Sequence, residues 1–392
     1  MYERDFVKTL ATRLAEPRRF LQIVEGPRQT GKSTAVSQAL AYSNAPRVEF
    51  SFDRPRDRRS KKLEEVWNEG RALLDQGDEA ILSLDEVQKV PEWSSTVKYL
   101  WDEDTRLGRN LKVVITGSST LMLRAGMAES LKGRFEILHS KQWSFAECRE
   151  AFGYSLDDFL YFGGYPGAAA IKDDENRWLD YLRGSIIEPT ITQDVLEMET
   201  VRKPALLRAL FEVGAVYSAQ EVSYRKLLGQ LDDRGNTDTI AHYLDLLSAA
   251  GLLSGIKKYD EKILKAKSSS PRLLVHDTSL MTASSGEGRE VLLGDGERRG
   301  HVVESAIGAY LLAQAKHEHF EVRWWREGGN EVDFVVSQGR RRTAIEVKSG
   351  RVKGTRGLGA FVREFPGTYA LVIGSDAFPV EDFLLGRVPL FQ

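Results

Sequence analysis

GPRQTGKS, residues 26–33, is the stretch that decides the fold of the first part of this 392-residue chain. An apolar run, FLQIVE (20–25), precedes it, and a run with helical spacing, TAVSQALAY (34–42), follows it. A strand, a glycine-rich loop and a helix in this order predict a P-loop, in which backbone N–H groups and a helix N-terminus surround phosphate oxygens. The alternative is an ordinary glycine turn before a helix.

The loop residues are the expected ligands of ATP. Lys32 is expected to reach the β- and γ-phosphates, and the hydroxyl of Ser33 to bind Mg²⁺. The nucleotide-binding set is predicted to be Gly26, Pro27, Arg28, Gln29, Thr30, Gly31, Lys32, Ser33 and Thr34. ATP and Mg²⁺ are therefore the expected cofactors.

A second apolar run, AILSLDEVQ (80–88), ends in two carboxylates, Asp85 and Glu86. In a parallel sheet the carboxyl ends of the strands meet at one edge, which would place this pair beside the P-loop. Asp85 is then expected to hold Mg²⁺, and Glu86 to orient or deprotonate the attacking water. The alternative is a solvated acidic turn after a strand.

Composition limits the class of protein. The chain is 42% hydrophobic and 29% charged, which is typical of soluble globular domains, and 392 residues exceed one ordinary core. Its net charge of −2 excludes binding of a polyanion by bulk charge, so a nucleic-acid surface would have to be local. One cysteine, no long apolar run and a charged N-terminus favour a cytoplasmic protein without membrane association.

The middle of the chain predicts three amphipathic helices within 203–253, followed by a strand-like segment with a basic tip. Three helices and a basic hairpin are typical of a winged helix, and such a wing commonly neutralises DNA phosphates. A winged helix that binds protein is the alternative. The cations of the hairpin are Lys257, Lys258, Lys262, Lys265, Lys267 and Arg272.

The last part of the chain predicts a helix (298–316) and then three strands within 320–350. Asp333 lies on the second strand. Glu346 and Lys348 lie two residues apart on the third, and therefore on the same face. An Asp followed after a hairpin by Glu-x-Lys is the PD-(D/E)xK nuclease pattern, in which carboxylates hold Mg²⁺ and the lysine stabilises the transition state. Asp333, Glu346 and Glu304, on the helix, are the expected metal ligands. The alternative is charged residues that only solvate a sheet.

Several stretches of this sequence, in the same order along the chain, resemble those of a family of bacterial and archaeal AAA-type ATPases. Members of that family carry a C-terminal domain of unknown function that has a nuclease-like core. The matching stretches span nearly the whole chain and are GPRQTGKST, SLDEVQKVPEW, VVITGSS, ESLKGR to SFAE, FLYFGGYPGAA, RLLVHDTSL, GHVVESAIGAYL and EVDFVV to AIEVKSG. The proline that often precedes the motif's aspartate is absent here, where Val332 precedes Asp333.

The resemblance implies further site residues. Thr116 or Ser118, at the end of the strand predicted over 111–119, corresponds to the polar residue that senses the γ-phosphate in such ATPases. Arg134 stands where an arginine finger acts on a neighbouring subunit, and Pro166 of GGYPG lies where a related motif packs near adenine. The alternatives are small polar residues at a strand end, a helix-terminal arginine and a simple turn.

The fold class predicted is α/β, with a P-loop AAA-like domain (1–150), a helical lid (151–202), a winged-helix-like domain (203–278) and a restriction-endonuclease-like α/β domain (279–392). The predicted function is ATP hydrolysis by a DNA-associated homo-oligomer, for which a hexamer is one candidate size. The last domain is expected to cleave DNA in a Mg²⁺-dependent reaction. The alternative is a nucleotide-controlled switch or scaffold that acts on a protein partner and has a non-catalytic nuclease-like domain.

Overall fold

The computed structural model of this chain describes residues 2–117, 130–196, 201–231, 236–260, 270–350 and 354–392. Within these residues the chain divides into two compact units, Met1–Lys141 and Gln142–Gln392, called unit 1 and unit 2 below. Ser118, one of the predicted sensor residues, lies outside the described residues, as do Lys262, Lys265 and Lys267 of the basic hairpin.

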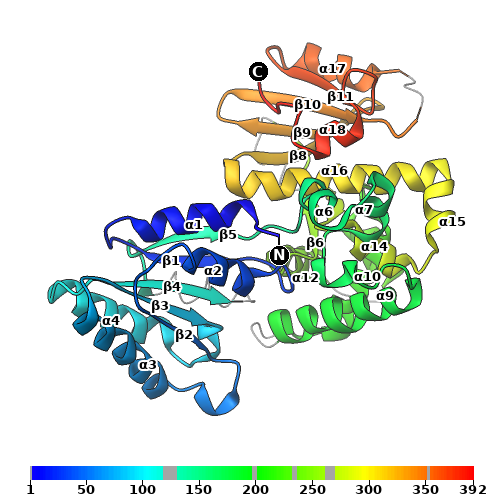
Figure 1. The fold of residues 1–392 in the computed structure, drawn as a ribbon. Coiled ribbons are helices and arrows are strands. Elements are labelled where there is room, and N and C mark those ends of the chain that lie inside the picture. The colour runs from blue at the N-terminus through cyan, green and yellow to red at the C-terminus, as the bar shows by residue number, and fades with distance from the viewer. Residues whose placement is uncertain (1, 118–129, 197–200, 232–235, 261–269, 351–353) are drawn as a thin grey trace. The chain divides into compact units, whose positions relative to one another are not determined.

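Unit 1 is a parallel five-stranded sheet with helices on both faces (Figure 1). The strand order is β2-β3-β4-β1-β5, so the strand that leads into the P-loop is separated from β3 by β4. The strands are β1 (Leu21–Glu25), β2 (Arg47–Ser51), β3 (Ala80–Asp85), β4 (Leu111–Gly117) and β5 (Phe135–His139). The helices are α1 (Asp5–Ala15), α2 (Lys32–Leu40), α3 (Ser60–Ala72) and α4 (Trp93–Arg106), with short 3₁₀ turns η1 (Pro55–Asp57), η2 (Leu73–Gln76) and η3 (Val87–Lys89).

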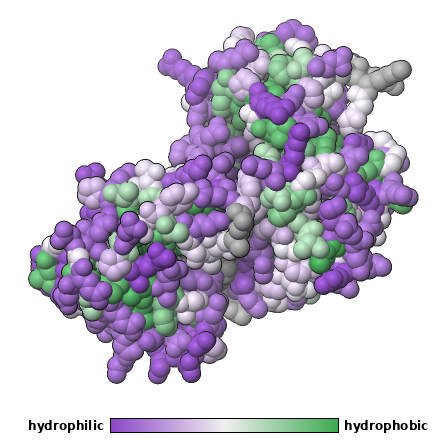
Figure 2. Space-filling model, in the orientation of Figure 1, coloured by the Kyte–Doolittle hydropathy of each residue, from purple (hydrophilic) through white to green (hydrophobic). Residues whose placement is uncertain are grey.

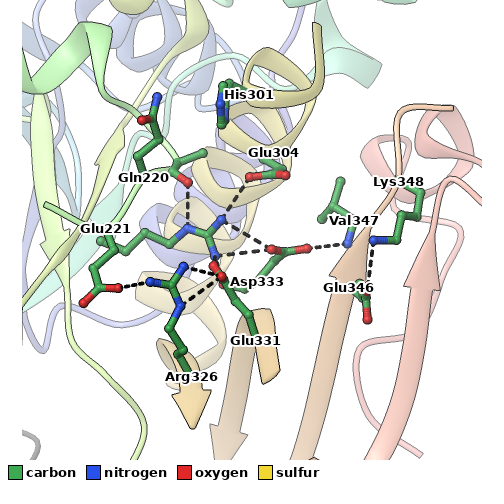
Figure 3. Close-up of a pocket in the computed structure, with 12 residues that line it drawn as sticks. Gln220, Glu221, His301, Glu304, Arg326, Glu331, Asp333, Glu346, Val347 and Lys348 are labelled. Atoms are coloured by element: carbon green, nitrogen blue, oxygen red, sulfur yellow. Dashed lines mark hydrogen bonds and ion pairs between the residues drawn. The ribbon is translucent and has the colours of Figure 1, made fainter. Parts of the chain in front are cut away.

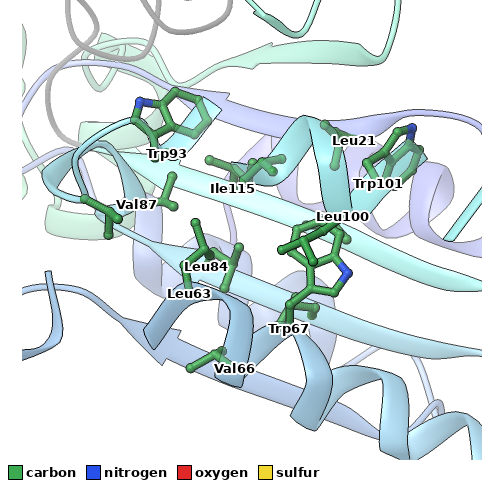
Figure 4. Packing of buried hydrophobic residues seen from close by; sticks show 14 of the residues in the cluster. Leu21, Leu63, Val66, Trp67, Leu84, Val87, Trp93, Leu100, Trp101 and Ile115 are labelled. Atoms are coloured by element: carbon green, nitrogen blue, oxygen red, sulfur yellow. The ribbon is translucent and has the colours of Figure 1, made fainter. Parts of the chain in front are cut away.

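The core of unit 1 has two layers because alternate strand residues point to opposite faces. Ile23 contributes to the layer under α3 and α4, and the next residue, Val24, to the layer under α1 and α2. Figure 4 shows the first layer, in which Trp67 and Trp101 pack with Leu84 and Ile115. Burial on both faces explains why the central strands β1, β3 and β4 are mainly apolar, and the parallel direction of all five strands places every carboxyl end at one edge.

Unit 2 begins with helices. They are α6 (Phe145–Phe152), α7 (Leu156–Phe162), α8 (Pro166–Ala169), α9 (Glu175–Tyr181), the π-helical segments η4 (Leu182–Ile187) and η5 (Thr190–Leu196), α10 (Pro204–Val216), α11 (Tyr224–Gln230) and α12 (Thr237–Ala249). The antiparallel hairpin of β6 (Leu253–Ile256) and β7 (Arg272–Val275) follows. The three helices and the hairpin predicted from 203 onward are therefore present.

The second of the three predicted helices, for which the helical spacing begins at residue 219, starts only at Tyr224. Residues 219–222 do not join α11 but pair with β7, where Ala219 N donates to Leu273 O at 2.8 Å and Leu273 N donates to Gln220 O at 2.9 Å. Ala219 has φ +63°, outside the helical region, and the Ser223 side chain caps α11 by accepting from Lys226 N. The tertiary pairing thus overrides the local helical spacing.

The rest of unit 2 consists of α14 (Thr278–Ser285), α15 (Arg289–Gly294), α16 (Gly296–Glu318), β8 (Glu321–Glu327), β9 (Asn330–Gln338), β10 (Arg341–Val347), α17 (Arg356–Glu364), β11 (Tyr369–Ile373) and α18 (Val380–Leu384). The sheet order is β11-β10-β9-β8, with β10 parallel to β11 and the other pairs antiparallel. Phe334 of β9 meets α16 at Gly308, and Val335 packs with Phe361 of α17, so the two helices cover opposite faces (Figure 1).

The face of the molecule drawn in Figure 2 is mostly polar. On the face drawn in Figure 2, hydrophilic side chains predominate and apolar ones form separate small areas. Among the described helices, none is both long and apolar enough to cross a membrane.

Candidate nucleotide site and carboxylate pocket

The P-loop of unit 1 begins where β1 ends and closes at the first turn of α2. Gly31 has φ +81°, in the left-handed region that glycine enters without strain. Gly26 is restricted for another reason, because a Cβ there would lie 2.1 Å from the carbonyl oxygen of Ser140. The two glycines therefore determine the course of the loop from β1 to the N-terminus of α2.

The Lys32 ammonium lies across this loop. Its Nζ donates to the carbonyl oxygens of Gly26, at 2.9 Å, and Pro27, at 2.6 Å, and the residue is buried. A cation with little water around it attracts a phosphate more strongly than one in bulk solvent. Thr30 is buried as well, whereas Arg28 is half-buried and Gln29, Ser33 and Thr34 are exposed.

Ser33, Asp85 and Thr116 come together at the carboxyl edge of the sheet. Ser33 Oγ lies 3.4 Å from both carboxylate oxygens of Asp85, and the Thr116 hydroxyl donates to Asp85 Oδ1. Burial raises the pKa of Asp85, and the hydrogen bond from Thr116 opposes this. Three residues from α2, β3 and β4 thus form one cluster of oxygen atoms, as the parallel sheet predicted.

This cluster suits Mg²⁺, which prefers hydroxyl and carboxylate oxygens. In the described part of the chain no group of three or more His, Cys, Asp or Glu side chains is arranged to hold a metal ion. In nucleotide sites, Mg²⁺ usually takes one or two ligands from the protein and the others from phosphate and water.

Glu86 follows β3 in a constrained position. Its φ is +55°, which is uncommon for a residue other than glycine, and its N–H donates to Thr116 O at 2.9 Å. The carboxylate accepts from Gln88 Nε2 at 3.0 Å and forms an ion pair with Lys89 Nζ at 2.8 Å. Lys89 also pairs with Asp53 at 2.7 Å. Burial disfavours the Lys89 ammonium, but the hydrogen bonds to Asp53 and Glu86 outweigh it and raise the pKa of Lys89.

Arg134 lies at the opposite edge of the sheet. Its carbonyl oxygen accepts from Leu21 N, the first residue of β1, at 2.8 Å. Since β1 has five residues, the P-loop begins about 16 Å further along. The guanidinium forms two hydrogen bonds with Asp102 of α4, at 2.7 and 3.0 Å, and hydrogen bonding to Arg134 lowers the pKa of Asp102. Arg134 is thus remote from the P-loop of its own chain.

GGYPG, which contains Pro166, lies in unit 2 and surrounds a buried carboxylate. Gly164 N donates to Asp277 Oδ2 at 2.8 Å, and a Cβ on Gly163 would lie 1.9 Å from Asp277 Oδ1. Pro166 is the first residue of α8. Burial raises the pKa of Asp277 to about 6, although hydrogen bonds from Ser279 and Gly164 oppose the shift. Packing around Asp277 accounts for these glycines, and the adenine role of Pro166 stays a prediction.

Unit 2 contains a cavity of about 460 Å³ between β9, the end of β10, α16 and β7 (Figure 3). Its lining is dominated by charged side chains. They are Glu221, Arg272, Glu304, Arg326, Glu331, Asp333, Glu346 and Lys348, with His301 and Gln220 beside them. Asp333, Glu304, Glu346 and Lys348, which the sequence pattern selected, are thus brought to one place.

A guanidinium stands among three of these carboxylates. Arg272 Nη2 lies 3.0 Å from Glu304 Oε2, and Nη1 lies 3.3 Å from both Glu331 Oε1 and Asp333 Oδ1. Its Nε donates to Ala219 O at 2.8 Å, and the residue is only 4% exposed. We call this set of four, Arg272 with Glu304, Glu331 and Asp333, the arginine–carboxylate cluster.

The remaining acid has a different environment. Glu346 Oε1 pairs with Lys348 Nζ at 2.7 Å, which agrees with the predicted common face. Glu346 Oε2 is buried and has no hydrogen-bond partner among the described residues. Asp333 Oδ2 accepts from Val347 N at 2.8 Å. Burial, and then the charge of Asp333, raises the pKa of Glu304 to about 8.

The position of Arg272 corrects an expectation. It was predicted to be one of the hairpin cations that contact DNA, but it points into the interior of unit 2 and its charge is neutralised by carboxylates. Glu331 was not selected either, although it lies two residues before Asp333 and strand alternation places both on one face. With the guanidinium in place, the carboxylates of the predicted metal site do not fit a divalent cation.

Comparison with known proteins divides the chain into three regions. Residues 18–149 match an AAA domain, residues 153–290 a domain of unknown function (DUF8612), and residues 299–390 another domain of unknown function (DUF4143). The N-terminal unit thus contains an AAA-type P-loop domain.

Similar proteins extend over most of the chain. An uncharacterized protein of Mycobacterium tuberculosis is 25% identical over 329 residues, which are 83% of this chain and 69% of that one. An uncharacterized protein of Methanocaldococcus jannaschii is 26% identical over 275 residues, 65% of this chain and 58% of that one. Among solved structures, the Thermotoga maritima RuvB Holliday junction branch migration motor has a TM-score of 0.32 and 16% identity, covering 64% of this chain and 85% of that one. A TM-score this low does not establish a shared overall fold.

Proposed function

We propose that this chain binds ATP with Mg²⁺ at the P-loop of unit 1 and hydrolyses it. The observation that carries the proposal is the convergence of Lys32, Ser33 and Asp85 at the carboxyl edge of a parallel sheet. In an AAA-type domain these groups supply a cation for the phosphates and the oxygens for Mg²⁺.

Each side chain has a part in this reaction. Lys32 binds the β- and γ-phosphates while the loop N–H groups orient them, and Ser33 and Asp85 would hold Mg²⁺. When bound there, the metal would neutralise charge that develops on the transferring phosphoryl group. Thr116 orients Asp85 through its hydrogen bond. Glu86 orients or deprotonates the attacking water. To do so, its carboxylate must leave the ion pair with Lys89 and accept a hydrogen bond from that water instead.

The role of Glu86 is tested by Glu86→Gln. Loss of the basic carboxylate is expected to lower the ATPase rate by about 100-fold or more, while the affinity for ATP changes little. ATPase rate and nucleotide affinity are measured on wild type, Glu86→Gln and, as a surface control, Glu64→Gln on the exposed side of α3. Normal turnover by Glu86→Gln would refute the assignment of the base.

We extend the proposal to a homo-oligomer in which Arg134 acts on the nucleotide of a neighbouring chain. Its place at the edge of the sheet opposite the P-loop supports this, because it cannot reach the phosphates of its own chain. Lys32→Ala and Arg134→Ala are each expected to lose activity, and mixing them is expected to restore part of it, since some interfaces then combine an intact P-loop with an intact arginine. If mixing restores nothing, action between chains is excluded.

For the last third of the chain we propose a nuclease-like fold. The order α16-β8-β9-β10-α17-β11, with Asp333 in β9 and Glu346 and Lys348 at the end of β10, supports it. The arginine–carboxylate cluster favours the second candidate function, a scaffold that does not cleave DNA, because the ligands expected for a metal already pair with Arg272. We therefore derive no cleavage step.

DNA association is the remaining part of the proposal. Lys257 at the end of β6 is exposed, and Lys258 is half-buried beside it. Neutralisation of phosphates by such cations makes binding weaken steeply with salt. Fluorescence anisotropy with duplex DNA at several salt concentrations, on wild type and Lys257→Ala, tests this. Indifference to DNA at low salt would favour a protein partner.

A further inference from the structure

We infer that Arg272 is the resident cation of the carboxylate pocket in unit 2, and that a divalent cation enters this pocket only in exchange for the Arg272 guanidinium. The inference rests on the proposed nuclease-like reading of α16 to β11, whose acids would otherwise be metal ligands. It adds that the site is blocked by a residue of the chain itself.

The contacts of Arg272 are those of a structural counter-ion. All three guanidinium nitrogens have partners, namely Ala219 O for Nε, Glu331 and Asp333 for Nη1, and Glu304 and Asp333 for Nη2. In Figure 3 the side chains of Glu304, Glu331 and Asp333 point toward one another. Carboxylates gathered in this way repel unless a cation stands between them, and here the cation is an arginine.

An independent observation indicates that the pocket is built for a cation. Glu346 is 9% exposed and lines the same cavity, yet its Oε2 has no hydrogen-bond partner among the described residues. A buried carboxylate oxygen normally has a partner, and a metal ion is one that would satisfy it. Five carboxylates face three permanent cations in the lining, which leaves an excess of acid even with Arg272 present.

The two cations exclude each other. The carboxylate oxygens lie 3.0–3.3 Å from the guanidinium nitrogens, whereas a divalent cation binds oxygen at about 2.0–2.6 Å and takes the central position itself. Two positive groups at one buried place repel strongly. Asp333 and its neighbours therefore pair with Arg272 or with a metal, but not with both.

The origin of Arg272 gives the exchange a structural route. Arg272 is the first residue of β7, in the hairpin with β6, whereas Asp333 and Glu346 belong to the C-terminal sheet. Because β7 and β9 belong to different sheets, a movement of β7 relative to β9 would withdraw the guanidinium from Glu331 and Asp333. The hairpin that we propose to contact DNA thus carries the residue that blocks the pocket.

The inference is tested by Mn²⁺ binding to the full chain without nucleotide, followed by electron paramagnetic resonance and by the melting temperature. All variants carry Asp85→Asn, which removes the carboxylate ligand of the proposed nucleotide site. Arg272→Gln is compared with three other proteins. They are the protein with Arg272 intact, the variant Arg272→Gln/Asp333→Asn, which lacks the proposed metal ligand, and the charge control Arg326→Gln. Arg326 is a matched control because it also pairs with Glu331, at 2.5 Å, but lies at the rim with a half-exposed side chain.

With Arg272 intact, we expect no Asp333-dependent Mn²⁺ site and no change of melting temperature with Mn²⁺. Arg272→Gln is expected to bind Mn²⁺ at least about tenfold more tightly and to melt higher in its presence, because the metal replaces the lost positive charge. Asp333→Asn should abolish this gain, and Arg326→Gln should not produce it. If Arg272→Gln does not fold alone, refolding with Mn²⁺ is expected to recover it.

Three results would overturn the inference. They are an Asp333-dependent Mn²⁺ site of equal affinity with Arg272 intact, the absence of a site in Arg272→Gln, and no recovery by Mn²⁺ of a misfolded variant. None of these depends on ATP turnover, so a failure here leaves the proposed ATPase untouched. Conversely, absence of ATP hydrolysis would not affect the metal-binding result.

Discussion

Two buried cations, Lys32 and Arg272, show how partners decide the role of a charged residue. Lys32 is held by the carbonyl oxygens of Gly26 and Pro27, which orient the ammonium but carry no net charge. Arg272 is held by carboxylates, which cancel its charge. The first cation suits an anionic ligand, whereas the second is itself the ligand of an acidic pocket.

The raised pKa of a second residue, Asp277, predicts how the free energy of unfolding depends on pH. Its pKa is raised to about 6 in the folded chain, against about 3.9 in an unfolded one. The protonated form is therefore favoured by folding, so the stability it contributes is complete below about pH 4 and is lost as the pH rises through 6. Between pH 4.5 and 7.5, the stability of Asp277→Asn should rise by about 2 kcal/mol relative to that of wild type.

The measurement is urea unfolding of both proteins at several pH values. Asp277→Asn is expected to be the less stable protein at low pH, because an amide cannot accept all of the hydrogen bonds from Gly164 and Ser279. Only the pH dependence of the difference tests the titration. A difference that stays constant from pH 4.5 to 7.5 would mean that Asp277 does not titrate as its burial implies.

At the scale of elements, tight junctions between segments matter more than the segments' own propensities. The turn after α7 contains Gly163 at φ +66° and ψ −159°, a region open only to glycine, and it closes on Asp277 at the start of α14. The stretch 219–222 likewise abandons its helical pattern to pair with β7. In both places the partner is more than fifty residues away in the chain.

Gly163→Ala tests the junction at α7. A Cβ there would lie 1.9 Å from Asp277 Oδ1, so unit 2 is expected to lose about 3 kcal/mol or more. Gly184→Ala is the matched control, since no heavy atom lies within 4 Å of its Cβ and η4 is helical. The control should be neutral or stabilised by about 0.5–1 kcal/mol. Equal melting temperatures for Gly163→Ala and wild type would show that the turn adapts.

At the scale of the whole molecule, the chain forms two units with cores of their own. Unit 1 has one apolar layer on each face of its sheet, and unit 2 has a separate cluster around Trp325, Val335 and Phe361. The proposed nucleotide site lies in unit 1 and the carboxylate pocket in unit 2. A ligand of one unit is therefore expected to stabilise that unit.

This expectation can be checked by calorimetry with a non-hydrolysable ATP analogue and Mg²⁺. At a concentration 100-fold above Kd, the analogue should stabilise unit 1 by about 2.7 kcal/mol and raise one melting transition. The transition of unit 2 should stay in place, and Lys32→Ala should remove the shift. An equal shift of both transitions would show that the two units unfold together.

The sequence by itself determined the elements and the local motifs. The P-loop, the acid pair after β3, and the helix and strands that carry Glu304, Asp333, Glu346 and Lys348 lie where hydrophobic periodicity and glycine spacing place them. Such patterns are local, because they depend on which residues share one face or one turn.

The tertiary structure alone decided which charges meet. Arg272 contacts Asp333, 61 residues later, and Arg134 pairs with Asp102, 32 residues earlier. Neither pairing has a periodic signature, and a basic residue in a hairpin looks the same in sequence whether it faces solvent or a buried carboxylate. Burial and long-range packing place the Arg272 guanidinium among carboxylates that the sequence pattern assigned to a metal ion. The pocket therefore holds a cation of the chain itself, which no local pattern could have predicted.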